Sequence, residues 1–480
     1  MFLLKSSQLL GKLTFLLILL VITDTKEAIA RNDSFCHSDL SEEIEEIIAE
    51  SESGVRWGIM IQSQTSDEVV YERNSDEFFI PASNVKLFTS AVALTQLDSD
   101  FEITTPIYQQ GNPPRLESLN IIGQGDPSLT TSDLEKLATT LKESGVEEID
   151  TVILETGYFS QPYLNSTWEW EDVYAFYGSP ANSLILDENS VNLTLTPTTV
   201  GEAVNKDWEN AIAASQWDVE SNVITTPAES DSNLNLRGQL GTAEIYLSGE
   251  LPKDREEAVW GLAIPNPDHY FRDTLLATLG EKGIQVRNIE FSEGSSERGE
   301  EMMRFNSPPL SELLEEVNLE SNNLYAESLL RILIAESPLV EEDMEVIEES
   351  LTGLGINSDH YHFADGSGLS RRNLVTPSAI AQLLKNISLT EAEDIFRSSL
   401  PVAGVSGTLE NRFQDTPLEG NLQAKTGTMT GISALSGYVE LPNYQPLVFS
   451  LMVNHYQVSA SEKREMMDNI LVLLSRLEEC

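Results

Sequence analysis

Hydrophobic and polar residues alternate in two parts of the chain that lie far apart in the sequence. Near the N-terminus, residues 55–61 carry Val, Trp, Ile and Ile at every second position, as in a half-buried strand, and 69–71 predicts a return strand. The C-terminal third repeats strand-like patterns at 422–428, 432–440 and 447–453, where turn residues separate the runs. Strands at both ends of the chain predict one antiparallel sheet that draws its strands from both termini.

Helical periodicity flanks these strands. The pair Ser38-Asp39 predicts the N-cap of a helix whose apolar face includes residues between 40 and 48. Near the other end, a capping box at 459–462 opens a helix whose apolar face runs from 466 to 477. Four further helical patterns predict a helical layer, at 310–317, 324–334, 340–354 and 377–387.

The middle of the chain, about 102–308, differs from both ends. Its strand-like runs are short and lie at 118–122, 151–155, 243–247 and 286–291. Helical patterns follow Ser132-Asp133 and cover 272–280, and the polar stretch 196–236 predicts a loop-rich region. We therefore expect the middle to be an insertion between the two parts that form the sheet.

The composition is that of a globular protein with an ample core, since 40% of the 480 residues are hydrophobic. The charge is very negative, because 29 basic against 78 acidic residues leave a net charge of −49. The acidic residues are spread along the chain, which indicates a solvated surface rather than an acidic tail. This charge argues against nucleic acid and against an anionic membrane surface as partners.

Residues 1–30 have the pattern of a signal peptide. Lys5 and Lys12 supply positive charge, 13–22 is a short apolar core, and 28–30 (Ala-Ile-Ala) offers a small-x-small cleavage site. The apolar run is short for a membrane span. We therefore expect export to the periplasm or cell envelope of a bacterium. An uncleaved anchor, with peripheral contact to a membrane, is the alternative.

The sequence has two cysteines, Cys36 and Cys480, one near each end of the exported part. An exported chain with two cysteines favours a disulfide. Two terminal helices that pack side by side would bring the cysteines together. Two unpaired thiols on frayed termini are the alternative.

The candidate chemistry begins at Ser83 and Lys86, which lie behind a proline and ahead of an apolar, helix-compatible run. If a helix begins near Ser83, Lys86 lies one turn later on the same face. An amine whose pKa is lowered can lose its proton and then accept the proton of the serine hydroxyl, which makes a nucleophile without a histidine. Ser-x-x-Lys occurs by chance in many proteins, so the spacing alone does not establish a catalytic site.

Other segments carry candidate chemistry, each with a plain structural alternative. Ser321 and Asn323 could relay a proton and hold a carbonyl, or they could only cap a helix. The run 425–428 (Lys-Thr-Gly-Thr) could grip a carboxylate, or it could protect an edge strand. The glycine-rich loop 363–373 carries two arginines and could be only a turn. The one close histidine pair, at 360–362, favours a structural role over a metal site.

Together, Ser-x-x-Lys, Ser-x-Asn and Lys-Thr-Gly in this order are the three signatures of the penicillin-recognising serine enzymes. Over nearly its whole exported part, the chain resembles the penicillin-binding protein 4 type of D-alanyl-D-alanine carboxypeptidase/endopeptidase. The resemblance is carried by the three signatures and by the stretches 123–129, 177–181, 307–314, 321–327, 365–370 and 400–404. Asn322 departs from this family, which often has aspartate at that position.

This resemblance implies an α+β fold. A β-lactamase/transpeptidase-like domain, an antiparallel sheet flanked by helices, would be split in the sequence by two smaller inserted domains. The catalytic domain would comprise residues 31–101 and 309–480. Inserted domain II would comprise 102–130 and 283–308, and inserted domain III would comprise 131–282.

The resemblance also implies a mechanism. Ser83 would attack the carbonyl of a peptidoglycan stem peptide ending in D-Ala-D-Ala, and Lys86 would take the proton of Ser83. Ser321 would pass a proton to the leaving D-alanine, and repulsion by nearby Lys425 would help lower the pKa of Lys86. Water would then hydrolyse the acyl-enzyme, with no metal or other cofactor. β-Lactams would be covalent inhibitors, because they resemble the acyl-D-Ala-D-Ala group.

The same resemblance assigns the contacts with the substrate. Lys425, Thr426 and Thr428 would hold the terminal carboxylate. Asn323 would orient the substrate amide. The backbone N–H groups of Ser83 and Thr428 would form the oxyanion hole.

Two other classes of protein remain as alternatives. A β-lactamase shares the acyl-enzyme chemistry but lacks so long a segment between the first two signatures. A non-catalytic wall-binding protein need not retain all the signature residues together. Carboxypeptidase and endopeptidase activity use the same site, so the sequence does not separate these two activities.

Overall fold

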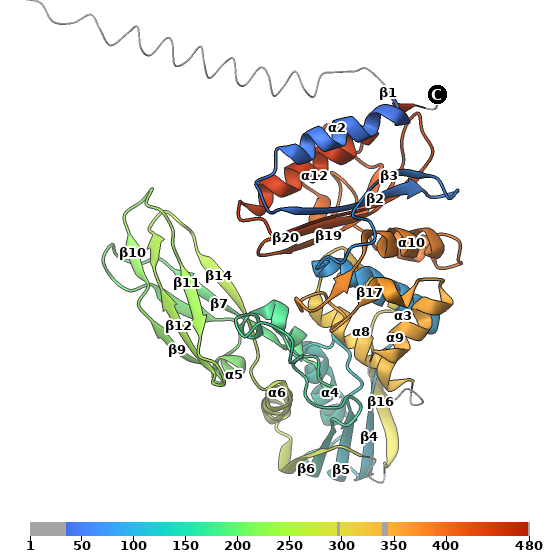
Figure 1. The fold of residues 1–480 in the computed structure, drawn as a ribbon. Coiled ribbons are helices and arrows are strands. Elements are labelled where there is room, and N and C mark those ends of the chain that lie inside the picture. The colour runs from blue at the N-terminus through green and yellow to red at the C-terminus, as the bar shows by residue number, and fades with distance from the viewer. Residues whose placement is uncertain (1–34, 295–297, 338–343, 479–480) are drawn as a thin grey trace, which may run out of the picture.

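The computed structural model describes residues 35–294, 298–337 and 344–478 (Figure 1). The predicted signal peptide and Cys480 lie outside these residues. Within the described ranges, no helix is both long enough and apolar enough to cross a bilayer.

Five strands from the two ends of the chain form one antiparallel sheet, in the order β19-β20-β21-β2-β3. These strands are Arg56–Ser63 (β2), Val69–Arg73 (β3), Leu422–Met429 (β19), Ile432–Val439 (β20) and Leu447–Asn454 (β21). The predicted sheet and the predicted α+β fold class are confirmed. The Lys-Thr-Gly run lies in β19, which is an edge strand of this sheet.

Helices cover both faces of this sheet (Figure 1). The helices α2 (His37–Ala49) and α12 (Ala460–Leu474) lie on one face. On the other face, α10 (Pro377–Ile387) joins the core that also contains α3 (Val85–Gln96) and α8 (Asn323–Ala335). The half-buried alternation expected for 55–61 is therefore wrong, because every residue of β2 after Arg56 is buried. Every residue of β20 and β21 is also buried, because helices cover the sheet on both sides.

Helix ends follow the sequence signals only in part. Ser459 caps α12 as predicted, since its hydroxyl accepts the backbone N–H of Glu462. The predicted cap at Ser38-Asp39 is wrong, because α2 already begins at His37. Leu477 was predicted to continue the apolar face of α12, but it lies in a short strand after the helix. Three further helices complete the helical layer, namely α7 (Leu310–Asn318), α9 (Glu345–Gly353) and α11 (Glu393–Ser398).

The middle of the chain builds a second five-stranded sheet, in the order β15-β6-β5-β4-β16. Its elements and the helices beside it are Thr104–Asn112 (β4), Arg115–Ile122 (β5), Glu148–Glu155 (β6), Gln285–Ser292 (β15), Glu300–Asn306 (β16), Thr131–Glu143 (α4) and Pro267–Glu281 (α6). The division into two inserted domains stays a prediction. However, β6 pairs with β5 and β15, so hydrogen bonding argues for a boundary beyond β6 rather than at residue 130.

Several smaller sheets and one short α-helix lie between β6 and α6 in the sequence. Their elements are Ser190–Thr196 (β7), Asn205–Trp208 (β8), Ala211–Ala214 (α5), Asp218–Ser221 (β9), Ile224–Thr226 (β10), Asn235–Gly238 (β11), Glu244–Ser248 (β12), Glu250–Pro252 (β13) and Ala258–Ala263 (β14). The expectation of a loop-rich 196–236 is therefore wrong in part. The strands in that stretch are only three or four residues long, and pairing with other segments fixes them.

Cys36 lies in β1 (Phe35–Cys36), which pairs in parallel with β22 (Leu477–Glu478) and places Cys36 opposite Glu478. Helices α2 and α12 pack together, as expected. Cys36 is disulfide-bonded, and Cys480 lies outside the described residues. The pairing of Cys36 with Cys480 stays a prediction.

We expect Cys36→Ser to lower the free energy of unfolding by about 2–4 kcal/mol, because a bridge between distant segments restricts the unfolded chain. Thermal unfolding with and without reductant measures this effect, and the reduced wild-type chain should behave like the variant. Recovery of Cys36 and Cys480 as free thiols in a non-reducing peptide map would contradict the prediction.

Candidate active site

Ser83 lies in a 3₁₀ turn (Ala82–Asn84) that runs directly into α3, so Lys86 lies one turn later. The Nζ of Lys86 is 3.1 Å from the Oγ of Ser83. It also donates to the Oδ1 of Asn323 and to the backbone carbonyl of Ser367, both at 2.6 Å. Three acceptors from separate parts of the chain therefore fix the amine beside the serine hydroxyl.

Lys86 is completely buried, whereas Ser83 is partly exposed. Burial disfavours the charged amine and lowers the pKa of Lys86 to about 7, although the carboxylates of Asp365 and Glu327 act in the opposite direction. Burial is the largest cause of the lowered pKa of Lys86. Burial also lowers the pKa of Lys425, and repulsion between the two amines adds to this effect. The expected contribution of Lys425 to the lowered pKa of Lys86 stays a prediction.

A second lysine–serine pair stands beside the first. Lys425 extends from β19 and is completely buried, and its Nζ donates to the Oγ of Ser321 at 2.7 Å. Ser321 has a left-handed backbone, with φ of 64°. Asn322 caps α8, because its Oδ1 accepts the N–H of Leu324 at 3.0 Å. Asn322 therefore has a structural role as the cap of α8, and Ser321 before it is hydrogen-bonded to Lys425.

Gly427 allows β19 to pass close to Ser83. A Cβ at this position would lie 2.7 Å from the carbonyl oxygen of Pro81 and 3.1 Å from the backbone nitrogen of Ser83. Gly368 serves the same purpose from the opposite side, because its φ is +87° and a Cβ there would lie 2.0 Å from the carbonyl oxygen of Ala82. The turn that carries Ser83 is therefore held between two glycine positions.

The remaining predicted site residues are Asn323, Thr426 and Thr428. They lie around Ser83 and differ in whether a hydrogen bond holds their side chain. The Nδ2 of Asn323 donates to the carbonyl of Tyr177 at 2.7 Å. Thr426 donates its hydroxyl to Thr408 at 2.8 Å. Thr428 is exposed and lines the same cavity as Ser83 and Asn323.

That cavity has a volume of about 420 Å³. Besides Ser83, Asn323 and Thr428, it is lined by Glu169, Asp172, Tyr177, Gly368, Leu369, Arg371, Met429 and Thr430. Arg371 joins two walls, since its Nε donates to Glu169 at 2.8 Å and its terminal nitrogens lie 3.2 Å from the carbonyl of Thr430. Sequence reasoning missed Glu169 and Asp172, because nothing in their local pattern connects them with Ser83.

The loop 363–373 is more than a turn. Glu327 accepts the backbone N–H groups of Gly366 and Ser367 at 3.0 and 2.8 Å, which fixes the Ser367 carbonyl that receives Lys86. Glu327 is buried, and burial raises its pKa to about 7. Sequence reasoning missed Glu327. Its place four residues after Asn323 on α8, hence on the same helix face, was the available signal.

Asp365 anchors the same loop to the middle segment of the chain. Its Oδ2 accepts the indole N–H of Trp168 at 2.9 Å, and its Oδ1 accepts the N–H of Gly368 at 2.8 Å. Over the described ranges, no group of three or more His, Cys, Asp or Glu residues is placed to hold a metal ion. The arrangement at the centre is that of a serine with a buried amine base.

The sequence profile of the D-Ala-D-Ala carboxypeptidase 3 (S13) family matches residues 40–477. The chain belongs to this family. It is therefore a hydrolase of the serine D-alanyl-D-alanine carboxypeptidase class, and the predicted recognition is confirmed.

Relatives support the assignment over most of the chain. The D-alanyl-D-alanine carboxypeptidase of Actinomadura sp. (strain R39) is 31% identical over 445 residues, which cover 87% of this chain and 81% of the relative. Penicillin-sensitive carboxypeptidase A of Dictyostelium discoideum is 28% identical over 465 residues and 88% of each chain. The crystal structure of penicillin binding protein 4 from Haemophilus influenzae has the same fold, with a TM-score of 0.79 at 24% identity over 90% of this chain and 99% of that one.

Proposed function

We propose that Ser83 is the nucleophile of this carboxypeptidase and that Lys86 is its general base. The observation that carries the proposal is the completely buried amine of Lys86, 3.1 Å from the partly exposed hydroxyl of Ser83. A neutral amine at this distance can accept the hydroxyl proton as the oxygen attacks a carbonyl. Because burial lowers the pKa of Lys86 to about 7, a large fraction of the amine is neutral at neutral pH.

The reaction proceeds through an acyl-enzyme. The Oγ of Ser83 forms a bond to the carbonyl carbon between the two D-alanines, and its proton goes to Lys86. The C–N bond to the terminal D-alanine then breaks, and Ser321 gives its hydroxyl proton to the leaving amine. Ser321 regains a proton from Lys425, and the proton that Lys86 took from Ser83 replaces it, so both lysines return to their starting state. Lys425, 2.7 Å from the Ser321 hydroxyl, supports that transfer. Water then hydrolyses the ester and frees Ser83.

The other contacts hold the substrate in place. Lys425, Thr426 and Thr428 bind the terminal carboxylate, and a carboxylate beside Lys425 favours its charged form. Asn323 orients the substrate amide with the part of its side chain not engaged by Lys86 and Tyr177. The N–H groups of Ser83 and Thr428 stabilise the oxyanion.

The same site accommodates two further reactions. An endopeptidase reaction on D-amino cross-links needs only a different leaving amine. A β-lactam acylates Ser83 and leaves slowly, in keeping with a relative that is named penicillin-sensitive. The chain acts in the cell envelope after export, which the signal-like pattern of residues 1–30 supports.

Mass analysis of products from a muropeptide mixture tests this function. Loss of one terminal D-alanine identifies the carboxypeptidase, and splitting of cross-linked dimers identifies the endopeptidase. An intact mixture after incubation would contradict both activities. Rapid turnover of penicillin would instead favour a β-lactamase.

The pH dependence of acylation reports the proton on Lys86. Because the base must be neutral, the acylation rate with penicillin should rise with pH through about 7, the pKa of Lys86. Glu327→Gln keeps an acceptor for the loop N–H groups but removes a charge that raises this pKa. We therefore expect the rising limb to move to lower pH in this variant.

Stopped-flow measurement of the acylation rate in buffers of increasing pH gives the position of the rising limb of the pH–rate profile. Glu336→Gln is the matched control, since Glu336 lies at the C-terminal end of α8 and accepts the hydroxyl of Tyr158. An unchanged limb in Glu327→Gln, or one that moves to higher pH, would show that Glu327 does not act on Lys86 as described.

A further inference from the structure

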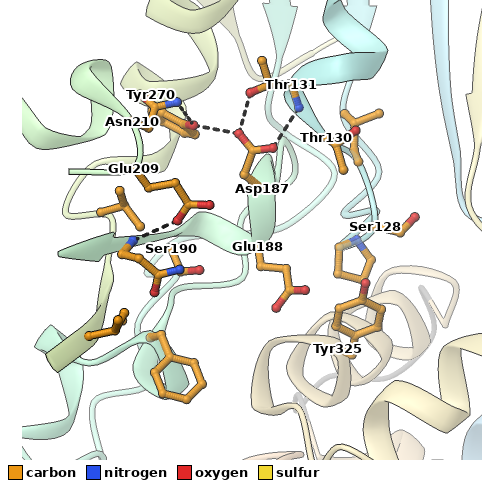
Figure 2. Close-up of a pocket in the computed structure, with 17 residues that line it drawn as sticks. Ser128, Thr130, Thr131, Asp187, Glu188, Ser190, Glu209, Asn210, Tyr270 and Tyr325 are labelled. Atoms are coloured by element: carbon orange, nitrogen blue, oxygen red, sulfur yellow. Dashed lines mark hydrogen bonds between the residues drawn. The ribbon is translucent and has the colours of Figure 1, made fainter. Parts of the chain in front are cut away.

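The protein has a second cavity, of about 760 Å³, whose lining residues are drawn in Figure 2. Its wall combines residues of the middle segment with Tyr325 of α8. The two cavities share a wall, because Tyr177 lines the active-site cavity and its neighbour Phe176 lines the second. Glu188, on the wall of the second cavity, accepts a hydrogen bond from Asn322 at 2.9 Å, one residue from both Ser321 and Asn323.

An aromatic platform is fixed in this cavity. Phe176 lies in a 3₁₀ turn (Phe176–Gly178) and is 56% exposed. Its ring packs over Gly261 of β14, where a Cβ would lie 2.9 Å from the ring. Val259, two residues away on the same strand and so on the same face, is 47% exposed. Together they present an apolar surface to the cavity.

The hydroxyl of Tyr325 is also available at the wall of this cavity. The residue as a whole is only 6% exposed, but its hydroxyl oxygen is open to the cavity and is not one of the buried, unpaired polar atoms of the described residues. It can therefore exchange a water partner for a hydroxyl group of a ligand. Figure 2 shows Tyr325 and the carboxylates of Glu188 and Glu209 around the same space.

The charges of the wall select the class of ligand. Asp187, Glu188 and Glu209 line the cavity, and no lysine, arginine or histidine of the described ranges does. An anionic ligand would therefore be repelled. Asp187 is already engaged by Thr131 and Tyr270, so it belongs to the support of the wall. The groups that remain available to a ligand are hydroxyl, amide and carboxylate groups beside an apolar surface.

We propose that this cavity binds the neutral glycan part of the substrate polymer, as a subsite beside the catalytic centre. The apolar face of a sugar ring would lie on Phe176 and Val259. Its hydroxyl groups would donate to Glu188 and Glu209 and pair with the hydroxyl of Tyr325. This subsite rests on the proposed function, since the peptide that reaches Ser83 is joined to a glycan strand. Binding at both places would raise the effective concentration of the peptide at the active site.

Titration calorimetry with an uncharged N-acetylglucosamine tetrasaccharide, which carries no peptide, tests the subsite in the full chain. We expect saturable binding that weakens about tenfold in Phe176→Ala, as for the loss of one aromatic contact. Glu209→Gln and Tyr325→Phe should also weaken it. Leu240→Ala is the matched control, because Leu240 is an exposed apolar residue (71%) of the middle segment that does not line the cavity.

A second measurement separates this subsite from the catalytic proposal. The preference in kcat/KM for a disaccharide-bearing muropeptide over its sugar-free stem peptide should fall in Phe176→Ala, while acylation by penicillin stays unchanged. Absence of tetrasaccharide binding, or binding that Phe176→Ala and Glu209→Gln leave intact, would overturn the subsite. So would binding of a simple diamine in place of the sugar. Since the titration needs no turnover, a failure of the Ser83 mechanism would leave its result intact.

Discussion

Ser83→Ala is expected to abolish labelling by a fluorescent penicillin and to lower carboxypeptidase kcat/KM by at least about 10⁴-fold, as loss of a catalytic nucleophile does. The reason is local, because Ser83 lines the active-site cavity beside the buried amine of Lys86. The nearby Ser321 makes a similar pair with Lys425, but it does not line that cavity. The methyl group of alanine fits the space of the hydroxymethyl group, so the fold should be unaffected.

The labelling is measured on denaturing gels together with release of D-alanine from a stem peptide. Ser398→Ala is the matched control, because Ser398 is an exposed serine in the helical layer that bonds only to its own helix. A covalent label that persists in Ser83→Ala would assign the nucleophile elsewhere. Intact D-alanine release would do the same.

Lys86→Met should lower the rate of acylation by about 10²–10⁴-fold, the usual contribution of a general base. Methionine has nearly the length of lysine and suits a completely buried position, but it accepts no proton. It also leaves the Oδ1 of Asn323 and the carbonyl of Ser367 without their donor. An unpaired buried acceptor costs about 1–3 kcal/mol, so the variant should be less stable as well as slow.

Lys463→Met separates the two effects. Lys463 is another buried lysine, bonded to Glu52, and lies in α12 on the far face of the sheet. Its loss should reduce thermal stability and leave the rate of acylation unchanged. An acylation rate in Lys86→Met close to that of the wild-type chain would remove Lys86 as the base and would direct attention to Lys425.

Much of the fold was predictable because neighbouring residues in the sequence mark its strands and helices. The strands of the sheet β19-β20-β21-β2-β3 were predicted within a few residues, since alternating apolar residues and turn residues mark them. The short strands β8 to β11 were not predicted, because their pairing with β7, β12 and β13 is not visible in their own sequence. Helix α2 began earlier than its polar pair suggested, because tertiary packing outweighs a weak cap.

The candidate site was predictable to a similar extent. Ser83 and Lys86 are one helical turn apart, so their contact follows from the backbone alone. The approach of Lys425 to Ser321 required the resemblance to a known family as well as the sequence. Glu169 and Asp172 could not be found, because segments from distant parts of the chain bring them to the site. Glu327 was indicated only by its place one turn after Asn323, and Asp365 only by its place in the loop 363–373.

By itself, the sequence determined that this chain carries a serine with an amine one turn away, three signatures in order and strands at both ends. Only the tertiary structure decided that Lys86 is completely buried, and therefore that its pKa falls to about 7. It also decided that a second cavity adjoins the active site across Phe176 and Tyr177. Helix and strand patterns are properties of neighbouring residues, whereas desolvation and cavity shape depend on every segment that packs around a point.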